Sequence, residues 1–188
     1  ILFDATASGL IIVKVIFPMF YISYLSLQNY NFYQNLLLFI FYFCSHMPEN
    51  SLLLKNLLKE HKQIVITTHK SPDGDAMGSS LAMFHFLKQL GHSVNVITPD
   101  SYADFLHWMP GNNDVLIYEE KKKEVQAITN NAQIIFFMDF NHISRISDFA
   151  NIVSNSDATK VLIDHHQDPD LDLADIIFSD TNASSTAQ

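Results

Sequence analysis

An α/β fold, in which helices cover both faces of a parallel sheet, is what this sequence predicts. From residue 47 onward, short apolar runs that suit buried strands alternate with longer segments of helical periodicity. This alternation favours parallel strands joined by right-handed crossovers. Three of the apolar runs also end directly in clusters of aspartate and histidine. Because a parallel sheet binds its ligands at the carboxyl ends of its strands, the same pattern predicts where the site lies.

The individual elements follow in chain order. Leucines at helical spacing predict a helix over 51–60, and the apolar run after it predicts a strand over 64–68. A second helix, from 75 or 76 to 90, ends at Gly91, since glycine readily takes the left-handed conformation that closes a helix. The other elements expected are strands at 94–97, 115–118, 134–138, 160–163 and 175–178, helices at 121–129 and 144–150, and the start of a further helix at 184–186.

Composition limits the class of protein. With 188 residues, of which 48% are hydrophobic and 16% charged, the chain can form one domain with a real core. The net charge of −9 argues against stable binding of duplex nucleic acid, although bound cations can reverse the field locally for a small phosphate substrate. Cys44 is the only cysteine, which excludes a disulfide framework and a zinc–thiolate site and is typical of a cytoplasmic protein.

Residues 1–46 differ in composition from the rest of the chain. They are rich in Ile, Leu, Phe, Tyr and Asn and carry few charges. The apolar stretch 10–27 is interrupted by Lys14 and Pro18, which makes it a poor membrane span, and no basic region or small-residue cleavage site of a signal peptide is evident.

Three interpretations of this leader stay open: a membrane anchor, a hydrophobic tail, or non-native sequence upstream of a true start at Met47. We favour the third because the composition changes abruptly at Met47. Residues 1–46 are therefore expected to lie outside the fold and 47–188 to form the domain, and membrane association is not expected.

The polar clusters at the predicted strand ends carry the chemistry. Carboxylate and imidazole groups are ligands of divalent cations, and close carboxylates are costly unless cations neutralise them. Any one cluster alone would be interpreted as a turn that caps the following helix. Three clusters at the ends of different strands instead indicate a centre of two metal ions, with these candidate residues: His69, Asp73, Asp75, Asp139, Asp164, His165 and His166.

These clusters resemble motifs one to three of the DHH phosphoesterase superfamily. The resemblance lies in His69-x-x-Pro72-Asp73-Gly74-Asp75-Ala76-x-Gly78-Ser79-Ser80-Leu81-Ala82, in Asp139, and in Asp164-His165-His166. Three further segments are similar to the bacterial branch of bifunctional oligoribonucleases and 3′-phosphoadenosine-5′-phosphate phosphatases: 90–94, 108–111 and 183–187. The match covers 47–188.

The resemblance implies a Rossmann-like DHH domain with two manganese ions, for which Mg²⁺ or Co²⁺ are alternatives. One ion would be held by His69, Asp73 and the bridging Asp139, and the other by Asp75, Asp139 and His165. His166 would lie nearer the substrate phosphate, Asp164 would support the cluster from the end of its strand, and both are candidate catalytic residues. The implied reaction is hydrolysis of short oligonucleotides, of 3′-phosphoadenosine 5′-phosphate, or of both, by metal-activated water.

Other segments near the site have plainer interpretations. Asn141 and Arg145 are expected to serve as a helix cap or in a surface ion pair rather than as substrate contacts. Ser184 and Ser185 are interpreted as helix-start residues whose amides could contact phosphate.

Alternatives within and beyond the superfamily stay open. A manganese pyrophosphatase shares two of the motifs, a membrane-tethered cyclic-dinucleotide phosphodiesterase would make the leader genuine, and a non-enzymatic binding module is a third option. The family's fourth-motif aspartate and second domain are not recognisable, so the chain is expected to be truncated, to bind metal weakly and to hydrolyse little by itself. A homodimer is compatible with the resemblance.

Overall fold

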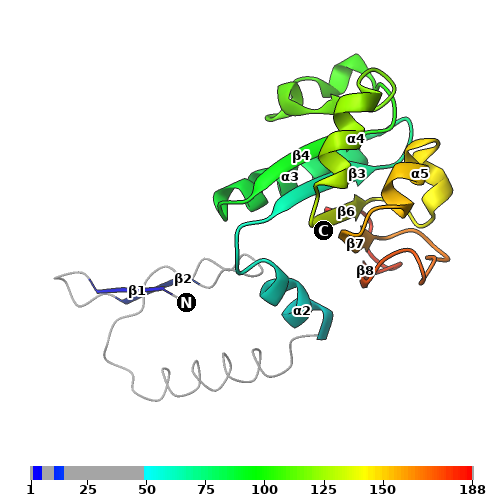
Figure 1. Ribbon diagram of the computed structural model, residues 1–188. Helices are drawn as coiled ribbons and strands as arrows, with labels where there is room; N and C mark the ends of the chain where they lie inside the picture. The colour runs from blue at the N-terminus through cyan, green and yellow to red at the C-terminus, as the bar shows by residue number, and fades with distance from the viewer. Residues whose placement is uncertain (1, 6–10, 15–48, 188) are drawn as a thin grey trace. The chain divides into compact units, whose positions relative to one another are not determined.

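A computed structural model describes residues 2–5, 11–14 and 49–187 of the chain (Figure 1). Two units, 1–48 and 49–188, are described separately. In the first, β1 (Leu2–Ala5) pairs antiparallel with β2 (Ile11–Lys14). Most of the apolar stretch 10–27 lies outside the described residues, so the interpretation of the leader stays a prediction. No helix in the described part of the chain has the length and apolar character needed to cross a bilayer.

The second unit is built on a six-stranded sheet in which every neighbouring pair is parallel, as the sequence predicts. The strand order is β5-β4-β3-β6-β7-β8. The chain therefore builds outward from β3 in one direction and then returns to build outward on its other side. The strands are β3 (Gln63–Thr68), β4 (Ser93–Thr98), β5 (Leu116–Ile117), β6 (Ile134–Met138), β7 (Thr159–Asp164) and β8 (Ile176–Ser179).

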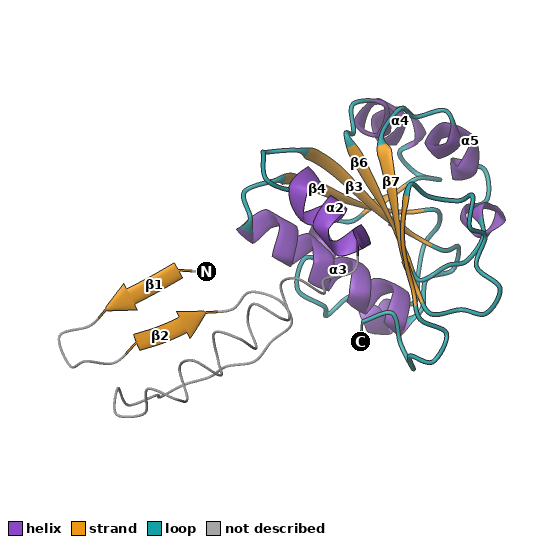
Figure 2. Cartoon of the chain, turned by 90° about the horizontal axis from the view of Figure 1, so that it is seen from below, coloured by secondary structure: helices purple, strands orange, loops and turns teal. Residues whose placement is uncertain are grey.

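Four helices cover the two faces of this sheet (Figure 2). They are α2 (Glu49–Leu57), α3 (Gly74–Gln89), α4 (Lys122–Asn130) and α5 (Phe149–Ser154). Helices α2 and α3 lie on one face and α4 and α5 on the other. The α/β fold class is thus confirmed.

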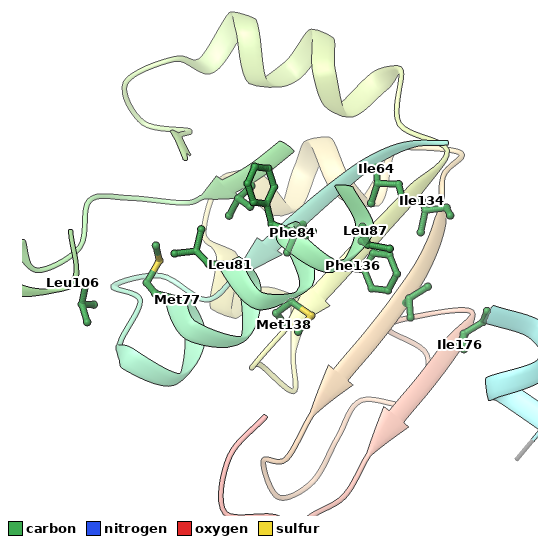
Figure 3. Close-up of a cluster of buried hydrophobic side chains, with 13 residues drawn as sticks. Ile64, Met77, Leu81, Phe84, Leu87, Leu106, Ile134, Phe136, Met138 and Ile176 are labelled. Atoms are coloured by element: carbon green, nitrogen blue, oxygen red, sulfur yellow. The ribbon is translucent and has the colours of Figure 1, made fainter. Parts of the chain in front are cut away.

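The two faces of the central strands form two hydrophobic clusters. Ile64, Ile134 and Phe136 point to the α3 side, where Met77, Leu81 and Leu87 of the helix pack against them (Figure 3). The intervening residues of the same strands, Val65, Ile135 and Phe137, point to the α4 and α5 side. All of these side chains are at most 3% exposed. Because β3 and β6 are buried on both faces, their carboxyl ends are held rigidly, which fixes the residues that follow them.

Most predicted elements are shifted by only one to three residues at their ends, but two predictions were wrong. The helix expected at 144–150 is two pieces, a 3-10 turn (Ile143–Ile146) and α5, because Ser147 between them has a φ of +50°, outside the helical region. Residues 184–186, all described, are a bend, an irregular residue and a turn rather than a helix. The helix predicted to end at Gly91 is confirmed, with Gly91 at φ +89°.

Candidate metal centre

Three neighbouring strands deliver the candidate residues to one edge of the sheet. In the parallel register, Thr68 of β3 pairs with Met138 of β6, and Met138 pairs with Ile163 of β7. The next residue along each strand is His69, Asp139 and Asp164, respectively. These three side chains therefore start at the same level, at the point where the strand order reverses, which is where open α/β sheets bind ligands.

Asp139 is the residue that the other candidates surround. It is 2% exposed and has a φ of +67°, an uncommon conformation for a residue other than glycine, and its amide donates to Ile163 O at 3.0 Å. Its two carboxylate oxygens face different imidazoles. His69 Nε2 lies 3.8 Å from Oδ2, and His165 Nε2 lies 3.5 Å from Oδ1. One carboxylate thus lies between two histidines, which is the arrangement that a bridging ligand requires.

The first group of donor atoms comprises His69, Asp73 and Asp139, which lie within 4.8 Å of one another. His69 Nδ1 is 2.8 Å from Lys70 O. A carbonyl can only accept, so Nδ1 carries the proton and Nε2, which faces Asp139, keeps its lone pair. Asp73 also caps α3, with Oδ1 accepting from the amides of Asp75 at 3.0 Å and Ala76 at 3.1 Å. Asp73 therefore both caps the helix and faces the candidate metal centre.

The second group of donor atoms comprises Asp139, His165 and His166, and Asp75 lies beside it. His165 Nδ1 is 3.2 Å from Ala183 O, so by the same argument His165 Nε2 is unprotonated in the neutral ring. That nitrogen is 3.5 Å from Asp75 Oδ2, the same distance as from Asp139 Oδ1. Asp75, Asp139 and His165, the set that the family resemblance implies, are thus brought together.

Distance alone also places His166 beside Asp139, within a group of donor atoms that spans at most 4.8 Å. However, His166 Nδ1 is 3.9 Å from Asp139 Oδ1 and only 2.7 Å from Asp164 Oδ1. The Asp164 carboxylate accepts a hydrogen bond from Nδ1–H, so this nitrogen has no lone pair to offer a metal. His166 Nε2 is left free, whereas His165 Nε2 lies 3.5 Å from both Asp75 and Asp139.

Electrostatics at the centre favour a bound cation. Burial, above all, raises the pKa of Asp139; the Asp75 and Asp73 carboxylates raise it further, while the hydrogen bond from Thr186 and the nearby His166 lower it. Within the described residues, no lysine or arginine forms an ion pair with Asp73, Asp75 or Asp139. Three carboxylates and two imidazoles with free nitrogens form a donor set that fits hard or borderline divalent ions.

Sequence reasoning missed two residues that contact these carboxylates. Ser185 Oγ donates to Asp75 Oδ1 at 2.8 Å, and the Thr186 amide donates to Asp75 Oδ2 at 2.9 Å. Thr186 Oγ1 donates to Asp139 Oδ1 at 2.7 Å. The amide of Thr186 therefore bonds a protein carboxylate. The position of Ser185 and Thr186 in the sequence could have indicated this contact. They follow β8, whose carboxyl end lies at the same edge of the sheet as the candidate residues.

The interpretation of Asn141 and Arg145 was also wrong. His142, rather than Asn141, caps the 3-10 turn at Ile143–Ile146, while Asn141 Nδ2 donates to Gln167 O at 2.7 Å and so ties the loops after β6 and β7 together. The Arg145 side chain makes no ion pair with any described residue. The carbonyl of Arg145 accepts from the Lys70 amide at 2.7 Å. The backbones of these two exposed basic residues therefore meet next to His69.

Comparisons with known proteins agree with the observed fold. The family described as "DHH family, N-terminal domain" matches residues 63–188. The crystal structure of an exopolyphosphatase-related protein from Bacteroides fragilis is 39% identical and superposes with a TM-score of 0.71, covering 73% of this chain. The chain spans 40% of the length of that protein. No curated protein sequence matches the chain.

Two more distant structures also match, and the first of them shares the fold alone. An α-glucosyltransferase in complex with UDP and a 13-mer DNA is 15% identical, with a TM-score of 0.50 over 64% of this chain and 38% of its own. Exonuclease RecJ bound to manganese is 15% identical over 74% of this chain and 34% of its own. Its TM-score of 0.44 is too low to support an argument.

Proposed function

This chain belongs to the DHH family, and from that premise we propose that it carries the metal centre of a phosphoesterase that hydrolyses short oligonucleotides, 3′-phosphoadenosine 5′-phosphate, or both. The observation that supports this most directly is the position of Asp139 between His69 and His165. A single buried carboxylate that faces two imidazoles, with further carboxylates beside each, suits a pair of divalent ions better than a single one.

The residues would divide between two ions. His69, Asp73 and Asp139 would hold one ion, and Asp75, Asp139 and His165 the other, with Mn²⁺ as the proposed metal and Mg²⁺ or Co²⁺ as alternatives. When bound, such ions lower the pKa of a water and neutralise charge on a phosphoryl group. His166, oriented by the 2.7 Å hydrogen bond to Asp164, would present Nε2 to the substrate phosphate.

The substrate is proposed to be small. The acidic chain would not hold a duplex, whereas a short oligonucleotide or nucleotide phosphate can be neutralised by the bound ions together with Lys70 and Arg145. We place this chemistry in the cytoplasm, because a single cysteine cannot form a disulfide within the chain.

Metal binding is the first test. Mn²⁺ would be titrated into the 188-residue chain and its Asp75→Ala and Asp139→Ala variants, with free Mn²⁺ followed by electron paramagnetic resonance. Glu60→Ala is the matched control, since Glu60 is an exposed acid at the opposite end of β3. We expect the control to bind as the parent does and both other variants to bind more weakly. Equal binding by all four chains would contradict the assigned ligands.

Hydrolysis is the second test, run with the chain in excess over substrate so that slow turnover is detected. Hydrolysis would be measured in the presence of Mn²⁺ and in the presence of chelator. Four substrates would be compared: a dinucleotide of two adenosines, 3′-phosphoadenosine 5′-phosphate, pyrophosphate and inorganic polyphosphate. We expect Mn²⁺-dependent release of AMP from the first two, lost in Asp139→Ala. Preferential release of phosphate from pyrophosphate or polyphosphate would reject the proposed substrates, and polyphosphate is included because of the name of the Bacteroides fragilis relative.

A further inference from the structure

The loop between β4 and β5 exposes two aromatic side chains. Phe105 is 73% exposed and Trp108 is 77% exposed, and they are the only aromatic residues among the large hydrophobic side chains that the described part of the chain leaves exposed. They lie three residues apart. Exposing two large apolar surfaces together is costly in water, so a pair at one place marks a contact surface.

This loop is attached directly to the candidate metal centre. Leu106, between the two aromatics, is 3% exposed, and its Cδ2 lies 4.0 Å from where a Cβ on Gly74 would be. Gly74 is the residue between Asp73 and Asp75. A second attachment comes from Asp100, whose carboxylate accepts from Ser71 N at 2.6 Å and from Ser71 Oγ at 3.2 Å.

The rest of the loop is anchored, so the exposure of the aromatics is a property of a defined conformation. Tyr102 Oη donates to Asn112 Oδ1 at 2.6 Å, and His85 Nε2 donates to Pro110 O at 3.0 Å. Gly111, at φ +87°, lies so close to the Phe84 ring that a Cβ there would be 3.2 Å from it. Phe105 and Trp108 are the large hydrophobic side chains that this anchored loop leaves exposed.

We infer that Phe105 and Trp108 form a stacking surface for a nucleobase of the substrate, an inference that rests on the proposed function. Trp108 lies two residues from Leu106, at most about 7 Å along the chain, so a nucleotide whose phosphate is held by the ions at Asp73 and Asp75 can reach it. Every base offers a π-face to an aromatic ring, so such a surface binds bases without reading their sequence.

The negative charge of the loop favours contact with the base of a nucleotide over contact with its phosphate. Residues 89–120 contain no lysine or arginine but carry five acidic residues: Asp100, Asp104, Asp114, Glu119 and Glu120. An acidic loop repels phosphate and accepts a neutral base. Lys70 and Arg145 lie instead at the turns that follow β3 and β6, so a bound nucleotide would place its phosphate toward the ions and these cations and its base toward the loop.

Trp108 is the only tryptophan of the chain, so its fluorescence reports this surface alone. In the presence of Mn²⁺, we expect AMP to quench Trp108 emission and ribose 5-phosphate to leave it unchanged. Calorimetry would then compare AMP binding to the parent chain and to Phe105→Ala, Trp108→Ala and Trp108→Phe. Each alanine variant should bind AMP at least about fivefold more weakly, Trp108→Phe should recover part of the loss, and ribose 5-phosphate affinity should not change.

Leu52→Ala is the control for loss of an exposed apolar side chain, because Leu52 is 53% exposed on α2. It should bind AMP as the parent does. Unchanged AMP affinity in both alanine variants, in a chain that hydrolyses dinucleotides, would overturn the inference and leave the proposed function standing. If Trp108→Ala abolishes self-association in sedimentation velocity without changing AMP affinity, the surface belongs to a second copy and the inference is also overturned. Failure of the chain to hydrolyse both dinucleotides and 3′-phosphoadenosine 5′-phosphate would reject the proposed function and the inference with it.

Discussion

The hydroxyl of Thr186 donates a 2.7 Å hydrogen bond to the buried carboxylate of Asp139, although 47 residues separate the two in sequence. Because Asp139 is the residue between the two histidines, this bond helps to fix the orientation of the whole centre. The same threonine holds Asp75 through its amide at 2.9 Å. Thr186, in the segment after β8, thus positions the carboxylates of Asp75 and Asp139, which follow two different strands.

Replacing Thr186 by valine should weaken Mn²⁺ binding. The change keeps the branched shape but removes the donor to Asp139, and loss of a hydrogen bond to a metal ligand typically costs about 10–100-fold in metal affinity. Thr186→Ser keeps the hydroxyl and should bind nearly as the parent chain does. Calorimetric Mn²⁺ titration of the three chains measures this difference. Equal affinity of the valine variant would show that the hydroxyl does not orient the ligand.

Asp139→Asn should stabilise the metal-free chain at neutral pH. Burial raises the pKa of Asp139, so the folded state binds its proton more tightly than the unfolded state. The stability of the parent chain therefore falls as pH rises from the unfolded carboxyl pKa, about 3.9, through the raised folded value, whereas asparagine does not titrate. Asparagine also tolerates the positive φ and can still accept from Thr186.

The measurement for Asp139→Asn is thermal melting with chelator across this pH range. The variant should melt above the parent chain at neutral pH, and the difference should disappear below about pH 3.9. Saturating Mn²⁺ should reverse the order, because the ion stabilises the carboxylate-containing chain by mass action. A variant that melts below its parent in chelator at neutral pH would mean that the charged carboxylate is stabilised by the protein alone.

The sequence was sufficient to predict the parts of the site that depend on local pattern. His69, Asp139 and Asp164 each follow an apolar run, and parallel pairing brings the ends of such runs together without further information. Ser185 and Thr186 could not be found this way. Their contacts to Asp75 span 110 and 111 residues, and no periodicity in the sequence encodes a contact between two loops.

The same limit explains which roles stayed open. His165 and His166 are adjacent in the sequence, which does not show what each ring faces. A backbone carbonyl accepts from His165 Nδ1, and the Asp164 carboxylate lies 2.7 Å from His166 Nδ1, so both bonds leave Nε2 free. The tertiary structure then places His165 Nε2 3.5 Å from both Asp75 and Asp139.

His165→Ala and His166→Ala should therefore have different effects. Removal of His165 deletes a nitrogen that faces both Asp75 and Asp139, so Mn²⁺ affinity should fall at least about tenfold. Removal of His166 should leave Mn²⁺ affinity within about twofold while lowering single-turnover hydrolysis by about 10²-fold or more, as expected for a proton-transfer or phosphate-contacting side chain. Paired calorimetry and single-turnover rates test this. A large loss of Mn²⁺ affinity in His166→Ala would instead make His166 a ligand.

Two substitutions of Asp73 separate its structural role as a helix cap from its role as a metal ligand. As the N-cap of α3 it accepts from two amides, and asparagine is an equally good cap, whereas alanine costs about 1 kcal/mol. Asp73→Asn should therefore unfold at the same urea concentration as the parent chain in chelator, and Asp73→Ala at a lower one. Both variants should lose Mn²⁺ affinity, because neither supplies a charged oxygen to the group with His69 and Asp139. If Asp73→Asn kept full Mn²⁺ affinity, Asp73 would be a helix cap only, and the group at His69 would retain just two ligands from the protein.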